Sequence, residues 1–228
     1  EEKIADEIVY TLEDAIDAGI QAAIIATPAV YHIQQAIKLL DANVHVLVEK
    51  PLSHNMENVN DFLEIAENSD GVGLMGYCLR HDPAAKQFKK MLNSEKTGQI
   101  LHVKVDCGSY LPDWRPGHDY RQTTSSKRET GGGVLLELSH ELDYVQWLLG
   151  PVKIDYAFNE KISTLKIDSD DMLTLNGHSH NGARVQINLN YFTKKPIRQI
   201  IIDGEGVSIQ GDLIANTLRS EEHTSELQ

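Results

Sequence analysis

The sequence predicts an α/β protein in which a parallel sheet covered by helices is followed by a mainly antiparallel sheet. Residues 20–77 repeat a strand, helix, strand order, which is typical of parallel sheets whose connections are helices. After Gly98 the sequence changes to long stretches of alternating apolar and polar residues joined by turn residues, the pattern of antiparallel strands. The predicted domains are therefore residues 1–97 and residues 98–218, followed by a separate tail over 219–228.

In the first domain, apolar runs at Ile20–Ala26 and Val44–Glu49 predict two buried strands, and Pro51 stops the second. Apolar residues three and four apart predict a helix over Val30–Leu40. The further elements expected here are a helix carrying Val59 to Ala66, a strand at Gly73–Tyr77 and a helix at Ala84–Leu92.

In the second domain, one helix is expected over Leu136–Leu149, ended by Gly150 and Pro151. The strands expected around it are ILHVKVDCGSY, VKIDYAFN, MLTLNGHSH, ARVQINLNYF and RQIIIDG.

Composition excludes several classes of protein. Hydrophobic residues make up 41% of the 228 and charged residues 24%, as in an ordinary globular protein. No apolar run approaches the ~20 residues of a membrane-spanning helix. The net charge of −13 disfavours nucleic acid as a partner. Cys78 and Cys107 both lie in strand-like runs, which favours reduced thiols, and no secretory segment opens the chain, so we expect a cytoplasmic protein.

The last ten residues, RSEEHTSELQ, resemble the translation of a sequencing-adapter oligonucleotide. We therefore expect the natural protein to continue past Leu218 and exclude the tail from the fold prediction. The alternative is an ordinary polar tail.

Lys50 is the first candidate catalytic residue. Thr27-Pro28 and Glu49-Lys50-Pro51 follow successive buried strands, and ligands of open parallel sheets bind beyond the carboxyl ends of the strands. A lysine partly removed from water there can donate a hydrogen bond to a substrate hydroxyl or take part in proton transfer. The alternative is a surface lysine paired with Glu49.

His140 is the second candidate. Glu137, His140 and Asp143 are three residues apart, so on one continuous helix two carboxylates would flank the imidazole and raise its basicity. Metal binding is the rival chemistry, but no second such motif supplies further ligands, and we predict no metal site. The remaining alternative is an amphipathic helix with exposed polar residues.

The most basic stretch is the long loop Leu111–Thr130, which precedes three glycines at Gly131–Gly133. The glycines let the backbone approach another group closely. Guanidinium groups with aromatic side chains suit phosphate or sugar recognition, so we favour ligand binding over a mobile lid or an oligomer contact. The residues concerned are Trp114, Arg115, His118, Tyr120, Arg121, Lys127 and Arg128.

Three segments together resemble the glucose-fructose oxidoreductase and inositol dehydrogenase (Gfo/Idh/MocA) family: IIATPAVYHIQQAIKLLDANVHVLVEKPLS, GYCLRHDP and GGGVLLELSHELDYVQWLLG. The resemblance covers residues 8–218. It implies part of a Rossmann parallel sheet joined to an α+β domain with an open sheet. It also implies NAD or NADP as cofactor, and oxidation or reduction of a hydroxyl or keto carbon on a sugar, cyclitol or nucleotide-sugar derivative.

The resemblance assigns roles to single residues. Lys50 and His140 match the catalytic lysine and histidine, which the reading of the residues also selected. A supporting role would fall to Glu137 and Asp143, although many members carry an aspartate four residues before the histidine. Cofactor contacts are implied for Thr27, Pro28, His32, Glu49 and Arg121, and substrate contacts for Tyr77, Trp114 and Arg115.

A second departure from the family is the absence of a Gly-x-Gly-x-x-Gly turn and of the strand before it. We therefore expect the first βαβ unit to be missing and the chain as given to be inactive, with the residue that chooses between NAD and NADP in the lost segment. In the intact protein, the ammonium of Lys50 and the imidazole of His140 are expected to act on one alcohol, and a homo-oligomer is expected through the open sheet. The alternatives are a dinucleotide sensor without catalysis and a redox-assisted lyase or glycosidase.

Overall fold

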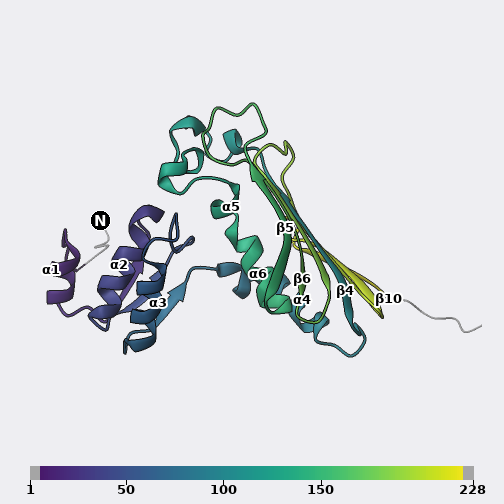
Figure 1. Ribbon diagram of the computed structural model, residues 1–228, viewed down its shortest axis with the longest axis horizontal. Helices are drawn as coiled ribbons and strands as arrows, with labels where there is room; N and C mark the ends of the chain where they lie inside the picture. The colour runs from purple at the N-terminus through teal and green to yellow at the C-terminus, as the bar shows by residue number, and fades with distance from the viewer. Residues whose placement is uncertain (1–5, 223–228) are drawn as a thin grey trace, which may run out of the picture. The chain divides into compact units, whose positions relative to one another are not determined.

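The computed structural model describes residues 6–222, and its chain contacts divide between Gly76 and Tyr77. Figure 1 shows the elements of both units. This division falls before Gly98, where the change in sequence texture suggested the boundary. The reason is the helix α4 (Pro83–Leu92): its Phe88 and Leu92 are buried in the core of the second unit.

The first unit is a three-stranded parallel sheet with helical connections, in the order β1-β2-β3. Ala22 pairs with His45 and Val46 with Gly73. The elements are α1 (Leu12–Asp17), β1 (Ala22–Ile25), α2 (Ala29–Asp41), β2 (His45–Val48), α3 (Val59–Asn68) and β3 (Gly73–Met75).

Only one face of this sheet is packed. The core joins Ala36 and Leu40 of α2 to Val46 and Val48 of β2, all at most 2% exposed. Strand side chains alternate between the two faces, and Ile24 on the opposite face is 73% exposed.

The second unit is a seven-stranded sheet in the order β10-β9-β8-β4-β7-β6-β5. β4 pairs in parallel with β7, and every other pair is antiparallel. This confirms the predicted fold class. Its strands are β4 (Ile100–Gly108), β5 (Val152–Glu160), β6 (Met172–Ser179), β7 (Arg184–Asn190), β8 (Ile197–Gly204), β9 (Val207–Asp212) and β10 (Thr217–Glu222).

The helices of the second unit lie along one face of its sheet (Figure 1). Val105 and Ile187 from the strands are buried with Phe88 of α4 and with Tyr144 and Val145 of α6 in one core. The helical elements are α4, α5 (Val134–Glu137), α6 (Ser139–Leu149) and five short 3-10 helices: η1 (Cys78–His81), η2 (Leu111–Asp113), η3 (Tyr120–Gln122), η4 (Thr124–Ser126) and η5 (Arg128–Thr130).

The structure differs from the sequence prediction in two regions. The single helix expected over Leu136–Leu149 is two helices, because Leu138 leaves the helical conformation with φ −102° and ψ 21°. The strands β9 and β10 were not predicted, since their short polar sequences lack a sustained apolar alternation. β10 pairs Arg219 with Gln210 of β9, so the start of the expected separate tail belongs to the sheet, and residues 223–228 lie outside the described part.

Candidate active site

The carboxyl ends of β1 and β2 are joined through His32, a residue of α2 that is 2% exposed. Its Nε2 lies 2.6 Å from the carbonyl oxygen of Thr27, and its Nδ1 lies 2.8 Å from the carbonyl oxygen of Pro51. Both partners can only accept a hydrogen bond, and a neutral ring has one donor nitrogen. A neutral His32 therefore donates to one of the two carbonyl oxygens, and its buried ring lies between the segments that follow the two strands.

Three polar residues that follow β1 and β2 are at least partly exposed to solvent. Glu49 is exposed and Lys50 is half-buried, immediately after β2, and the Lys50–Pro51 peptide is cis. Thr27 is exposed, and its hydroxyl donates to Oε1 of Gln35 at 2.7 Å. A hydroxyl, a carboxylate and an ammonium thus follow the carboxyl ends of parallel strands, which is where open α/β sheets bind their ligands.

His140 lies at the second position of α6 and is half-buried. Its Nε2 is 3.2 Å from Oε1 of Glu141, a carboxylate with no exposed surface. The same Oε1 accepts a hydrogen bond from Nε of Arg198, on β8, at 2.6 Å, and lies 2.5 Å from Nη2 of the same guanidinium in an ion pair. The ion pair between Glu141 and Arg198 therefore lies next to the imidazole of His140.

The pKa shifts around this pair show that it is ionised. Burial alone would raise the pKa of Glu141, but hydrogen bonding with His140 and the charge of Arg198 outweigh burial, and the pKa is lowered. Burial, together with the charge of Glu141, raises the pKa of Cys107 to about 12. Tyr144 is shifted upward for the same two reasons, so its pKa lies well above the usual value. Of these acidic groups, Glu141 alone carries charge at neutral pH.

The two carboxylates expected to flank His140 have other partners. Glu137 belongs to α5, before the break, and accepts a hydrogen bond from Oγ of Ser125 at 2.5 Å. Asp143 accepts two hydrogen bonds from Arg80, at 2.8 and 2.5 Å. The prediction that Glu137 and His140 lie on one continuous helix was wrong, because the helix is interrupted at Leu138, whereas Asp143 does follow His140 by three residues on α6.

Sequence reasoning missed Glu141 and Arg198. Adjacent residues on a helix point in different directions, so the His140-Glu141 pair gave no spacing signal. Arg198 lies at the start of a strand far along the chain, and only the folded sheet brings it to α6.

The glycines before α5 approach protein atoms. A Cβ on Gly132 would lie 2.6 Å from the carbonyl oxygen of Ser125 and 2.7 Å from that of Lys127. A Cβ on Gly133, which has φ +112°, would collide with the carboxylate of Asp170. The close approach predicted from the glycines is confirmed, and the groups approached are carbonyl oxygens of η4 and Lys127 and the carboxylate of Asp170.

Trp114 packs inward. Its Nε1 donates to Oγ of Ser109 at 2.7 Å, and its ring meets the ring of Tyr191 edge-on, with centroids 5.1 Å apart. The hollow beside Trp114 and Arg115 has a volume of about 10 Å³, which is room for about one water and not for a sugar. Arg115 is exposed, and Tyr77 is half-buried at the start of η1.

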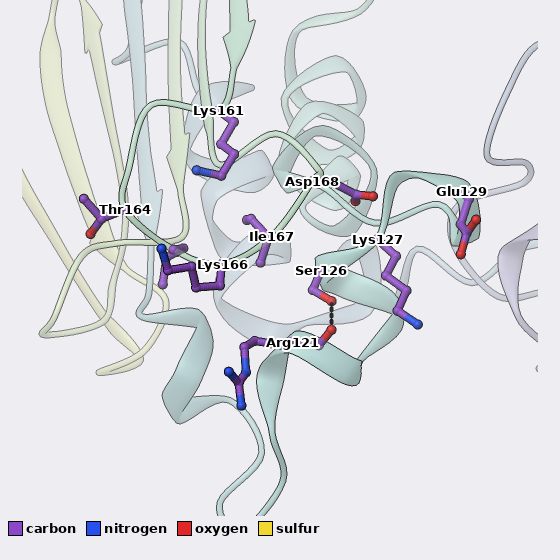
Figure 2. Close-up of a pocket in the computed structure, with 10 residues that line it drawn as sticks. Arg121, Ser126, Lys127, Glu129, Lys161, Thr164, Lys166, Ile167 and Asp168 are labelled. Carbon is purple, nitrogen blue, oxygen red and sulfur yellow. Dashed lines mark hydrogen bonds between the residues drawn. The ribbon is translucent and has the colours of Figure 1, made fainter.

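Arg121 is exposed and forms a bidentate pair with Asp119, with Nη2 2.6 Å from Oδ2. Hydrogen bonds from Arg121 lower the pKa of Asp119. Arg121 also lines a hollow with residues of the loop between β5 and β6, including Lys161 and Lys166 (Figure 2). Sequence reasoning missed this second loop, whose lysines form no recognisable motif.

Two negative findings hold for residues 6–222. This part of the chain holds no group of three or more His, Cys, Asp or Glu side chains placed to bind a metal ion. Its helices are also too short or too polar to span a bilayer.

Two family models match the chain. The model of the oxidoreductase family with an NAD-binding Rossmann fold matches residues 3–77, and the model of the GFO/IDH/MocA C-terminal domain matches residues 85–210.

Known proteins show the same relationship. The chain is 31% identical over 135 residues to an uncharacterized oxidoreductase of Synechocystis, covering 59% of the chain and 36% of that protein. It is 25% identical to the 2,7-anhydro-N-acetylneuraminate hydratase of Mediterraneibacter gnavus, covering 92% of the chain and 57% of that protein.

Among solved structures, the WlbA dehydrogenase of Bordetella pertussis, in complex with NADH and UDP-GlcNAcA, is 25% identical and superimposes with a TM-score of 0.82. The match covers 96% of the chain and 64% of that protein. The chain thus spans less than two thirds of each of these relatives. With both family models matched in order along one chain, the protein belongs to the GFO/IDH/MocA family of oxidoreductases.

Proposed function

We propose that the protein is an NAD- or NADP-dependent oxidoreductase acting on a hydroxyl or keto carbon of a sugar, cyclitol or nucleotide-sugar derivative. The family, the parallel sheet with its accessible carboxyl edge, and a relative in complex with NADH and a nucleotide sugar support this proposal. When bound, the cofactor exchanges a hydride with the substrate carbon.

In this proposal, His140 takes the proton of the substrate hydroxyl, and Lys50 polarises the same oxygen by donating a hydrogen bond. Thr27, Pro28 and Glu49 would contact the cofactor, with His32 holding the strand ends that carry them. Arg121 is proposed to contact the cofactor, and Tyr77 and Arg115 the substrate.

The main observation in support of this proposal is the ion pair of Glu141 and Arg198 next to His140. The carboxylate of Glu141, which has no exposed surface, lies 3.2 Å from Nε2 of His140 and can fix the orientation and the tautomer of the imidazole, as a general base requires. Arg198 keeps the carboxylate ionised and in place. Glu141 thus takes the supporting role that the sequence suggested for Glu137 and Asp143.

The test uses the full-length protein with Lys50→Met and His140→Gln variants. Each variant is expected to lower kcat by about 10²- to 10⁴-fold, while the affinity for the dinucleotide, measured by quenching of tryptophan fluorescence, stays within about twofold. Lys86→Met, at an exposed position of α4, is the matched control and keeps full activity. Full turnover in both Lys50→Met and His140→Gln would remove the assignment.

A redox-assisted elimination or hydration is the second candidate, and the similarity to a hydratase over 92% of the chain favours it. In such a reaction the oxidation is transient and the cofactor is regenerated. Absorbance at 340 nm separates the two reactions: a dehydrogenase accumulates or consumes reduced cofactor in proportion to product, whereas the elimination leaves it unchanged.

We also propose a homo-oligomer formed through the open sheet, and a cytoplasmic location. Exposed apolar side chains on the edge strand β5, Ile154 at 55% and Tyr156 at 56%, support the first. The absence of a disulfide between Cys78 and Cys107 agrees with the second. Analytical ultracentrifugation of the wild type and of an Ile154→Asp variant tests the interface.

A further inference from the structure

The hollow between η3–η5 and the loop joining β5 to β6 has a volume of about 670 Å³, which is in the range of small-molecule sites. Four cationic and two acidic side chains line it: Arg121, Lys127, Lys161, Lys166, Glu129 and Asp168. Figure 2 shows the four cationic groups arising from both loops. The whole hollow lies within the second unit.

The charge of this hollow is opposite to that of the chain. The sequence holds 34 acidic residues against 21 lysines and arginines, yet the lining has two positive charges in excess. Like charges gathered around one hollow repel each other, and a bound anion removes that repulsion. The local reversal of sign therefore indicates an anionic ligand.

Two of the lysines, Lys127 and Lys166, can pair with a bound anion. Among the described residues, no ion pair engages Lys127, which is half-buried, or Lys166, which is exposed. Lys161 donates one hydrogen bond, to the carbonyl oxygen of Ser163 at 2.7 Å, and has donors to spare. Arg121 uses Nε and Nη2 on Asp119 and retains its other N–H groups.

Hydrogen bonds join the two segments that form the hollow, residues 120–128 and residues 166–168. The main-chain N–H of Asp168 donates to the carbonyl oxygen of Ser126 at 3.2 Å, and the Asp168 carboxylate accepts from the main-chain N–H of Arg128 at 2.8 Å. At the other end, the main-chain N–H of Lys166 donates to the hydroxyl of Tyr120 at 3.2 Å. The lysines thus project from two loops held in fixed register.

We propose that this hollow binds a phosphate group. A phosphate monoester carries a charge of about −1.5 to −2 at neutral pH, which balances the two positive charges in excess, whereas a single carboxylate would leave one uncompensated. The phosphate belongs either to the substrate or to a separate phosphorylated compound, and the substrate source rests on the proposed oxidoreductase function.

Calorimetric titration of the full-length protein with inorganic phosphate tests the site without turnover. Saturating dinucleotide is present, so that the diphosphate subsite of the cofactor is already filled. Lys127→Gln combined with Lys166→Gln is expected to weaken binding by about tenfold or more, and added salt weakens the wild type in the same direction. Lys86→Gln, which removes an exposed lysine outside the hollow, binds as the wild type does. Equal affinity in the double variant and the wild type, or no binding to either, overturns the proposal.

Steady-state kinetics then identify the source of the phosphate. If the substrate carries it, the double variant raises KM for a sugar phosphate about tenfold and leaves KM for the uncharged sugar unchanged. If both KM values stay constant while binding of inorganic phosphate is lost, the ligand is a separate phosphorylated compound, and the proposal of a phosphate site is retained. Loss of turnover in the Lys50 and His140 variants is independent of either result, so failure of this site and failure of the proposed function remain distinguishable.

Discussion

The guanidinium of Arg198 reaches the carboxylate of Glu141 at a point where that carboxylate has no contact with solvent, with Nε 2.6 Å from Oε1. The pair links β8 to α6 and places a fixed negative charge beside His140. It serves both the packing of the helix on the sheet and the chemistry proposed for the imidazole.

Replacing Arg198 with Met should destabilise the folded protein, because the buried carboxylate of Glu141 then loses its main partner. We expect the free energy of unfolding to fall by about 3–5 kcal/mol, measured by urea denaturation. The double variant Glu141→Gln with Arg198→Met, which removes both charges, should be more stable than Arg198→Met alone. A double variant at least as unstable as the single one would contradict an ion-pair role.

Acid should weaken the fold through Glu141. Its pKa in the folded protein is lowered below the ordinary value of 4.5, so the unfolded chain takes up the proton first as pH falls. The contribution of Glu141 to stability is therefore complete above pH 4.5 and is lost below it, as pH passes through the folded pKa. Urea midpoints measured from pH 7 to pH 3 should fall less steeply in Glu141→Gln; an identical pH dependence in both proteins would refute this.

Gly132→Ala tests the close approach before α5. The added methyl would meet carbonyl oxygens of residues 124, 125 and 127, the last two at 2.6 and 2.7 Å, and we expect a loss of about 1–3 kcal/mol from this overpacking. Gly182→Ala is the control: no atom lies within 4 Å, and its φ of +87° alone costs about 1 kcal/mol. Thermal unfolding that ranks the two variants in the reverse order would show that the turn can move aside.

Trp114→Phe separates packing from substrate binding. The change deletes the hydrogen bond to Ser109 and part of the contact with Tyr191, so stability should fall by about 1–2 kcal/mol. KM for the substrate of the full-length protein should stay within about twofold. A large rise in KM without loss of stability would restore the substrate contact that the sequence suggested.

Much of the fold could be predicted because its elements carry strong local signals. The apolar spacing in Val30–Leu40 and the buried run at Val44–Glu49 correspond to α2 and β2 within two residues at each end. The break at Leu138 could not be predicted, because leucine favours helices and no proline or glycine marks the position.

The candidate site likewise contains residues that the sequence could predict and residues that it could not. Lys50 and His140 are marked by their positions after a strand and within a glycine-led helix, and the structure places each on the expected element. Glu141, Arg198 and Lys166 depend on contacts between segments far apart in the sequence, for which one sequence offers no local sign.

The position of β4 in the middle of the larger sheet affects how the chain is made. Asp106 of β4 bonds Asn188 of β7 across 82 residues, and His102 contacts Asp203 of β8 across 101 residues. β4 is synthesised long before either neighbour, so its backbone groups and apolar side chains cannot form their native pairs until β7 and β8 have been made. During that interval the nascent chain is most exposed to chaperones and to aggregation.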